Sequence, residues 1–231
     1  MAISLDIQNI LQFFSFLSPI LISTYLIFQS FMEANLKGPM WLIGSLISWA
    51  IGIAFKSMFH RIDDNKVNKF IKNNQKVPEG TRTFQRIPVR HNLPLNPGQT
   101  KNSTPDYCNV FSGPFSNSAL YTTSMPSLNA IFHAFTISYI GSGIAVNPNH
   151  PFGGILFLIS ITILAVINWM FRITLYCDKI LDVVVGAVLG IGAGIAWFTA
   201  INNINPTWTY YSKEKQGKCV LGTQKFSCTY E

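Results

Sequence analysis

Five long apolar runs constrain this chain more than any other feature of its sequence. A helix that crosses a membrane needs roughly 20 consecutive, mostly apolar residues. Only 12% of the 231 residues are charged, roughly half the fraction typical of a soluble domain. Inside hydrocarbon a helix satisfies its own backbone hydrogen bonds, so each run is expected to be helical. The predicted spans are Ile10–Met32, Pro39–Phe59, Ser127–Val146, Gly153–Tyr176 and Ile180–Ile201.

The third of these runs is the weakest prediction. It carries Asn129, His133 and several hydroxyl side chains, which are unfavourable against lipid. The first run is not expected to be a cleaved signal peptide, because no Lys or Arg precedes it and it is longer than a typical signal core. The sequence therefore predicts an all-α, multi-pass integral membrane protein, a helix bundle with about five transmembrane helices.

The segments between the runs divide the chain into four parts. The first 17 residues of the large loop are basic, and they are expected to form either an interfacial helix on anionic headgroups or a solvated loop. The rest of the loop is rich in Pro, Asn, Ser and Thr and cannot bury much apolar surface by itself, which favours contact with a partner. The parts are two transmembrane helices (1–59), the extramembrane loop (60–126), three transmembrane helices (127–201) and an extramembrane tail (202–231).

The distribution of Lys and Arg predicts the orientation in the membrane. Basic residues crowd the end of the second span, so the positive-inside rule places the N-terminus and the long loop in the cytoplasm and the tail in a lumen or outside. One feature argues the other way: Asn102 begins the glycosylation sequon Asn-Ser-Thr in the long loop. Such triplets arise often by chance, and the lysines are given more weight.

The tail has the pattern of a short β-hairpin. β-forming and polar residues alternate on both sides of Gly222. Cys219 and Cys228 flank the expected turn, and the sequence leaves open whether they form a disulfide or are two free thiols. The other two cysteines, Cys108 and Cys177, have no neighbouring Cys/His pattern for zinc, and no metal site is expected.

Charged residues are concentrated where the fourth run ends and the fifth begins. The stretch "RITLYCDKILDVVVGAVLG" holds Arg172, Asp178 and Asp182. Ionisable groups at membrane depth are costly and usually face a protein interior or a wet cavity, so a function is their default hypothesis. The fourth and fifth helices form a tight antiparallel hairpin in this arrangement, which brings the three side chains to its mouth.

This stretch resembles the third signature of the phosphatidic-acid phosphatase type 2 superfamily. That signature reads Ser-Arg, five residues, His, three residues, Asp, and then a Gly-rich apolar helix; here Arg172, Asp178 and Asp182 have the same spacing. The segment "SMPSLNAIFHAF" is similar to the second signature, Pro-Ser-Gly-His, with Ser127 in place. The resemblance covers roughly residues 125–197 and implies the superfamily's helix-bundle core, with a phosphate site where the helix ends meet. Family members usually have six spans, whereas five are found here.

The departures from the family pattern affect the catalytic positions. The resemblance implies a histidine nucleophile where this chain has Asp178, and a histidine acid where it has Asn129. An amide supplies no proton near neutral pH, and two carboxylates beside an anionic substrate oppose its binding. His133 lies one helical turn beyond Asn129 and is a poorly placed substitute. The family's first signature, Lys, six residues, Arg-Pro, is not found.

Arg172 has two interpretations. In the family the equivalent arginine holds phosphate oxygens, and Arg82 and Arg86 of the long loop are the other phosphate-binding candidates. Alternatively, Arg172 pairs with Asp178 or Asp182 and joins the two helices, since a charge taken out of water needs a partner. The ion pair is favoured over phosphate binding.

Small residues in the fifth run suggest close helix packing. Gly186, Gly190 and Gly194 recur every four residues, a spacing that lets membrane helices approach closely. The contact is either with a second chain or within the bundle, and the resemblance favours the bundle.

The function predicted from these features is structural. We expect a catalytically inactive, phosphatase-like membrane protein that serves as a scaffolding subunit of a virion membrane or a multi-subunit membrane complex. Its partners would be the lipid bilayer and proteins that contact the long loop and the tail. An active lipid-phosphate phosphatase with an atypical site and a phospholipid-headgroup-binding pseudoenzyme are the alternatives. No cofactor is expected, and the net charge of +7 belongs mainly to lysines flanking the spans, so nucleic-acid binding is not indicated.

Overall fold

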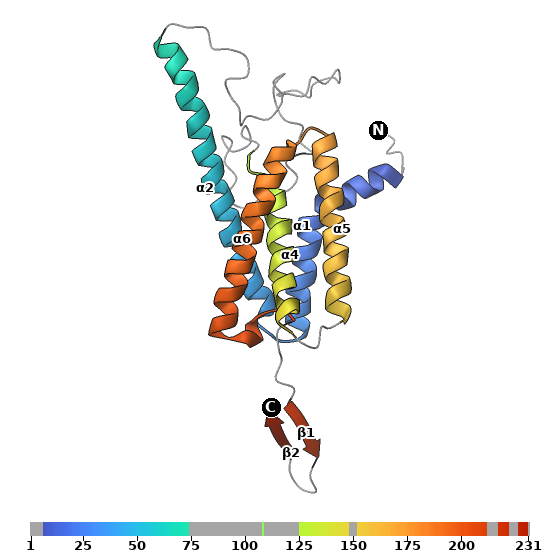
Figure 1. Cartoon of the computed structure of the whole chain (residues 1–231). Helices are drawn as coiled ribbons and strands as arrows, with labels where there is room; N and C mark the ends of the chain where they lie inside the picture. The colour runs from blue at the N-terminus through green and yellow to red at the C-terminus, as the bar shows by residue number, and fades with distance from the viewer. Residues whose placement is uncertain are drawn as a thin grey trace.

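In the part of the chain that the structure describes, five long helices form a bundle, with a small hairpin beyond one end (Figure 1). The computed structural model describes residues 7–73, 108, 125–147, 152–211, 217–221 and 226–230. All five helices are long and apolar enough to cross a membrane, which supports the predicted multi-pass bundle. The helices are α1 (Ile7–Met32), α2 (Lys37–Lys72), α4 (Leu128–Val146), α5 (Phe152–Thr174) and α6 (Ile180–Ile204).

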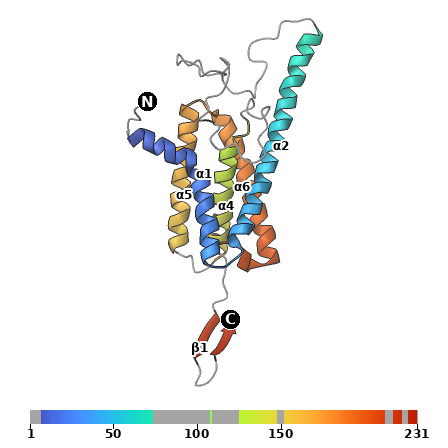
Figure 2. The same ribbon diagram turned by 180° about the vertical axis from the view of Figure 1, so that it is seen from behind.

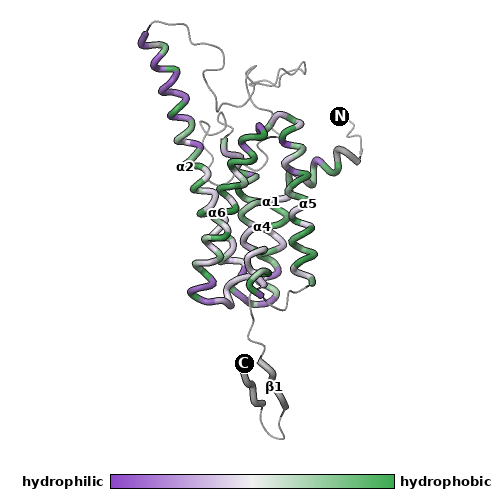
Figure 3. The backbone as a smooth tube through the Cα atoms, viewed as in Figure 1, coloured by the Kyte–Doolittle hydropathy of each residue, from purple (hydrophilic) through white to green (hydrophobic). Residues whose placement is uncertain are grey.

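Helix α4, the weakest prediction, is the centre of the bundle. It packs against α1, α2, α5 and α6, and 67% of its apolar window is buried, the largest share of the five helices. Figures 1 and 2 show it enclosed by the other helices from both sides. Its polar residues, Asn129 and His133 among them, therefore contact protein instead of lipid. The strongly apolar outer helices are coloured green along much of their length in Figure 3.

Helix α2 is longer than the span that the sequence predicts. It runs without interruption from Lys37 to Lys72, about 54 Å at 1.5 Å per residue. Its basic end projects beyond the bundle and is coloured purple in Figure 3. From residue 60 to 72 the chain therefore forms neither a separate interfacial helix nor a loop, but the continuation of α2. The physical reason is the absence of a helix breaker, because no Gly or Pro occurs between Gly52 and Pro78.

The glycines of α6 lie against α4. A Cβ atom added to Gly186 would lie 2.6 Å from the carbonyl oxygen of Ser127, and one added to Gly190 would lie 2.4 Å from that of Ile131. A Cβ atom added to Gly194 would lie 2.6 Å from the carbonyl oxygen of Phe135. These contacts are with backbone atoms and cannot be relieved by a side-chain rotation. The small residues thus serve packing inside the bundle, where the two backbones nearly touch.

Aromatic side chains close the end of the bundle from which the tail leaves. After α6 the chain forms a short 3-10 helix, η2 (Pro206–Trp208), and Tyr210 then turns back into the bundle, where its hydroxyl donates to the Leu26 carbonyl oxygen at 2.6 Å. Asn147 Nδ2 donates to the Tyr211 carbonyl oxygen at 2.9 Å. Burial raises the pKa of Tyr211 to about 12 and that of Tyr210 further, so both phenols stay protonated and neutral.

The tail contains the predicted hairpin. Strand β1 (Gly217–Leu221) pairs antiparallel with β2 (Phe226–Tyr230), and Cys219 lies opposite Cys228 in the register. The side chains of both strands lie outside the described part of the chain, so the bridge between the two cysteines stays a prediction.

Candidate functional site: a polar cluster at the mouth of the bundle

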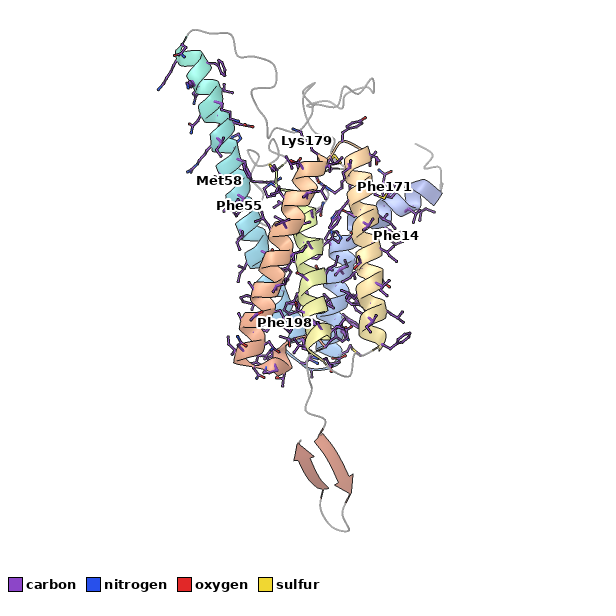
Figure 4. The ribbon with its side chains drawn as sticks, in the orientation of Figure 1. Phe14, Phe55, Met58, Phe171, Lys179 and Phe198 are labelled. Carbon is purple, nitrogen blue, oxygen red and sulfur yellow. A yellow bond between two sulfur atoms is a disulfide. The ribbon has the colours of Figure 1, made fainter. Side chains whose placement is uncertain are left out.

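Three helix ends meet at the end of the bundle opposite the hairpin. Ser127 precedes α4, Arg172 lies in the last turn of α5, Asp178 follows α5, and Asp182 lies in the first turn of α6. We call these four residues the mouth cluster. All four are buried, with at most 5% of the residue surface exposed. Figure 4 labels Lys179 at the turn above α6 that marks this end. The convergence of these helix ends is the arrangement that the resemblance implies.

An ion pair lies at the centre of the mouth cluster. Arg172 Nε donates to Asp178 Oδ2 at 2.5 Å, and Ser127 Oγ donates to the same carboxylate oxygen at 2.7 Å. One carboxylate oxygen thus joins the ends of α4 and α5. The sequence left open whether Arg172 pairs with Asp178 or Asp182, and in the structure the partner is Asp178. A buried guanidinium paired in this way has its charge neutralised from within the protein.

The turn after α5 places Asp178 beside Arg172. Tyr176 adopts a left-handed backbone conformation with φ of 57°. The Cys177 N–H donates to the Arg172 carbonyl oxygen at 2.8 Å, and the Tyr176 N–H donates to that of Ile173 at 3.1 Å. These two bonds are the Schellman pattern that ends many helices. The Asp178 N–H also donates to the Arg172 carbonyl oxygen, at 3.2 Å. The chain therefore folds back over Arg172, and the Asp178 carboxylate reaches the guanidinium.

Asp182 performs a different task from Asp178. Its Oδ2 accepts a hydrogen bond from the Lys179 backbone N–H at 2.9 Å, which satisfies a free donor at the start of α6. A carboxylate in the first helical turn is also stabilised by the helix dipole. The Asp182 carbonyl oxygen accepts from the Ser127 N–H at 3.0 Å and so ties α6 to the start of α4. Both interactions are structural.

A disulfide attaches the long loop to the mouth cluster. Cys108 and Cys177 are bridged, and both are buried, at 3% and 0% exposed. Arg172 Nη1 donates to the Cys108 carbonyl oxygen at 3.3 Å, so the loop caps the guanidinium. On the other side, the Arg172 guanidinium carbon lies 6.0 Å from the centre of the Phe16 ring. The sequence missed this bridge, because 69 residues separate the cysteines and connectivity cannot be read from spacing.

His133 is occupied away from the mouth cluster. Its Nδ1 lies 2.8 Å from the Asn129 carbonyl oxygen, and its Nε2 lies 2.9 Å from Ser18 Oγ. A carbonyl oxygen only accepts, so Nδ1 carries a proton. The residue is 1% exposed and one helical turn deeper than Asn129. Both ring nitrogens are therefore engaged, Nδ1 within α4 and Nε2 in a contact that joins α4 to α1.

A proline in α1 creates a second polar contact at this depth. Pro19 has no N–H, so the carbonyl oxygen of Ser15 has no helical donor. It accepts instead from Asn168 Nδ2 and from Ser18 Oγ, both at 2.6 Å. Figures 1 and 2 show α1 bent away from the bundle near the mouth end. The polar residues below the mouth cluster thus compensate for a helix break.

The remaining predicted site residues fall into two groups. Asn129 is buried and one turn from His133, and no hydrogen-bond partner for its Oδ1 lies among the described residues. The phosphate-binding candidates Arg82 and Arg86 and the sequon residue Asn102 lie outside the part of the chain that the structure describes. A further basic residue that the sequence counted only as a flanking charge, Lys56, is 3% exposed.

Comparison with known proteins adds no relative. No protein-family model, no curated protein and no solved structure matches this chain. The resemblance to the phosphatase superfamily therefore rests on the two stretches of the sequence alone.

Proposed function

We propose that this chain is a catalytically inactive, multi-pass membrane protein that serves as a structural or scaffolding subunit of a membrane-associated assembly. A virion membrane or a multi-subunit membrane complex fits this role. The proposal includes a bundle related to the phosphatidic-acid phosphatase type 2 superfamily, in which the phosphate site has become an internal ion pair.

The observation that carries the proposal is the pairing of Arg172 with Asp178. In the family arrangement the arginine binds phosphate and the residue at position 178 attacks it. Here Asp178 Oδ2 lies 2.5 Å from Arg172 Nε. A phosphate group could bind the guanidinium only by displacing this carboxylate from a buried ion pair. The displaced Asp178 carboxylate would be left as a buried charge without its cation, next to an anionic group, which opposes substrate binding.

The proton-donating side of the reaction is also missing from the mouth cluster. Asn129 has no proton to give a leaving group near neutral pH. His133 is bonded to Ser18 and to the Asn129 backbone, one turn deeper, so both of its ring nitrogens are already engaged. These features support an anchoring role for the bundle and leave the long loop and the tail as the surfaces for partners.

The scaffold role holds for either orientation in the bilayer. The lysines at the end of α2 favour a cytoplasmic loop, whereas the disulfide favours the opposite arrangement. With five spans, the loop and the tail face separate compartments in both cases. A scaffold of this kind would contact one set of partners on each side of the membrane.

The test of the proposal is phosphate release by the purified full-length chain. Phosphatidic acid and an isoprenyl pyrophosphate are the substrates, and release at the background rate of a protein-free detergent control is expected. Release above background that Asp178→Asn abolishes would establish the alternative, an active phosphatase with an atypical site.

A second measurement separates the scaffold from a lipid-binding pseudoenzyme. Gentle purification followed by lipid analysis is expected to recover the same lipids from the wild-type chain and from Arg172→Ala. An anionic phospholipid that co-purifies with the wild type and disappears in Arg172→Ala would favour headgroup binding. Recovery of the chain as a lone monomer, with no associated protein, would count against the scaffold role.

A further inference from the structure

We infer that the mouth end of the bundle faces the oxidising side of its membrane, either the exterior or a lumen, and that the tail faces the reducing cytoplasm. This orientation is the reverse of the one that the lysines of the long loop predict. It goes beyond the scaffold role and does not depend on it.

The first argument is the position of the described disulfide. The Cys108–Cys177 bridge joins the long loop to the turn between α5 and α6, two segments on the same side of the membrane. Both cysteines are buried against Phe16 and Leu175, and the Cys108 carbonyl oxygen bonds to Arg172. The bridge is therefore part of the packed structure at the mouth end. Disulfides persist in exterior and lumenal compartments and are rare in the cytosol.

The second argument is that the chain has a second pair of cysteines on the opposite side. Five spans put the tail across the membrane from the mouth end. Cys219 and Cys228 lie directly opposite each other in the hairpin register. A membrane that separates an oxidising from a reducing compartment favours a bridge in only one of these pairs. Because the bridge at the mouth end is built into the packed helix ends, we expect the tail cysteines to be thiols.

The third argument comes from the basic residues of the short segments. The positive-inside rule is most dependable for loops of up to about 60 residues, and long loops cross a membrane largely regardless of charge. The connection from 60 to 126 has 67 residues, so its distant basic residues carry little weight, and those close to the second span, from Arg61 to Lys76, are the charges that oppose this orientation. Among the short segments, the tail side holds five lysines and the mouth side holds one, Lys179. The five are Lys37, Lys213, Lys215, Lys218 and Lys225.

The reversed orientation also accommodates the glycosylation sequon. Asn102 precedes Cys108 by six residues in the sequence, and no span separates them. An oxidising lumen is also the compartment in which asparagine glycosylation occurs. Partners of the long loop would then be exterior or lumenal, and partners of the tail would be cytoplasmic.

The first experiment counts thiols in the full-length chain. Cells that express it are quenched in acid, denatured and treated with a maleimide that adds a fixed mass to each thiol. Two additions are expected without reductant and four after reduction. Cys219→Ser is expected to lower the unreduced count to one, and Cys108→Ser to raise it to three by releasing Cys177.

The second experiment measures the orientation directly. The chain carries an epitope tag at either terminus and is expressed in a eukaryotic host, and sealed vesicles from its endoplasmic reticulum are treated with protease. The C-terminal tag is expected to be digested and the N-terminal tag to be protected, because an odd number of spans separates them. Detergent makes both tags accessible and provides the control for sealed vesicles.

The two experiments have outcomes that would overturn the inference. A protected C-terminal tag with a digested N-terminal tag gives the opposite orientation. Two additions that Cys108→Ser lowers to one, with Cys219 and Cys228 unreactive until reduction, assign the bridge to the tail. Four additions without reductant, or none, show that the two pairs do not occupy different redox compartments.

Discussion

The two ends of the bundle are closed by opposite kinds of chemistry. At the mouth end, a buried ion pair, a charge-assisted hydrogen bond from Ser127 and a disulfide hold the helix ends and the loop together. At the tail end, neutral groups do the same work, with Tyr210 bonded to Leu26 and Trp197 Nε1 donating to the Met40 carbonyl oxygen at 3.0 Å. Both ends are packed, so charge is not needed to close a bundle of this shape.

The difference shows where the sequence has retained costly groups. A buried ion pair is weak evidence for stability, because well-packed apolar residues often replace it without loss. The tail end demonstrates such a solution within the same chain. Closing the bundle therefore does not by itself require the charged residues at the mouth end. Five measurements test this difference between the two ends.

Replacing Arg172 by leucine is expected to produce the largest effect. It leaves the Asp178 carboxylate buried without its cation, and the expected loss is about 3–5 kcal/mol of unfolding free energy. Thermal unfolding in detergent measures it. The double variant Arg172→Leu/Asp178→Leu is expected to recover most of the loss. If the double variant is as unstable as the single one, the mouth end depends on its charges and the contrast with the tail end fails.

Cys177→Ser is expected to cost about 2–4 kcal/mol, the usual range for a native disulfide. The loop would lose its covalent attachment beside Arg172. The matched control is Cys228→Ser at the other end, for which we expect a change within about 0.5 kcal/mol, as for a surface substitution. Equal losses in the two variants, measured by thermal unfolding without reductant, would contradict the assignment of the bridge to one end.

Gly186→Ala tests the backbone contact below the mouth cluster. The added methyl group would lie 2.6 Å from the Ser127 carbonyl oxygen and would push α4 from α6, with an expected cost of about 1–3 kcal/mol. Gly192→Ala in the same helix is the control, since no atom beyond its chain neighbours and the adjacent backbone of its own helix lies within 4 Å of its Cβ position. The control is expected to be neutral or slightly stabilising, because alanine is the better helix former. A similar loss in both would mean that helix propensity, and not packing, decides.

Tyr210→Phe removes one neutral hydrogen bond at the tail end while keeping the ring. The Leu26 carbonyl oxygen loses its donor, and the expected cost is about 1 kcal/mol. Ser127→Ala is the comparison at the mouth end, where the bond to a carboxylate is worth about 1.5–3 kcal/mol. The two ends differ in the predicted way only if the serine variant unfolds at the lower temperature.

Tyr176→Gly is expected to give the smallest effect and a gain. The tyrosine has φ of 57°, a conformation that costs a non-glycine residue about 1 kcal/mol. Its side chain is 60% exposed, so little packing is lost. A rise in unfolding free energy of up to about 1 kcal/mol is expected, less the entropy that glycine gains in the unfolded chain. A clear loss of stability would show that the tyrosine ring has a contact role.

The sequence predicted the spans but not which of them lies at the centre of the bundle. The apolar runs set the helices, because length and hydropathy decide membrane insertion. The polar residues of α4 made it look marginal, yet they are tolerated since α4 is surrounded by protein. The full length of α2 was not predicted, because hydropathy marks only the apolar part of a helix. The helix itself can continue through polar residues until a residue such as proline ends it.

The mouth cluster was predicted as a set of residues but not as a set of bonds. Spacing brought Arg172, Asp178 and Asp182 together, because the helix ends of a tight hairpin must meet, and the resemblance added Ser127. Which aspartate pairs with Arg172 depends on the Schellman turn at Tyr176. A left-handed backbone conformation is not predictable for a tyrosine from its residue type. The bridge to Cys108 depends on the path of a long loop, which local sequence does not fix.

The projecting end of α2 and the bridge at Cys108 together turn a long connection into a tether with two fixed ends. Helix α2 carries the chain about 20 Å past the thickness of the hydrocarbon layer, and the disulfide returns it to the membrane surface after 35 residues, 73–107. Each of these residues is within about 18 residues of an anchor, or about 60 Å of fully extended chain. Any molecule that binds to this connection would therefore be held within that distance of the bundle.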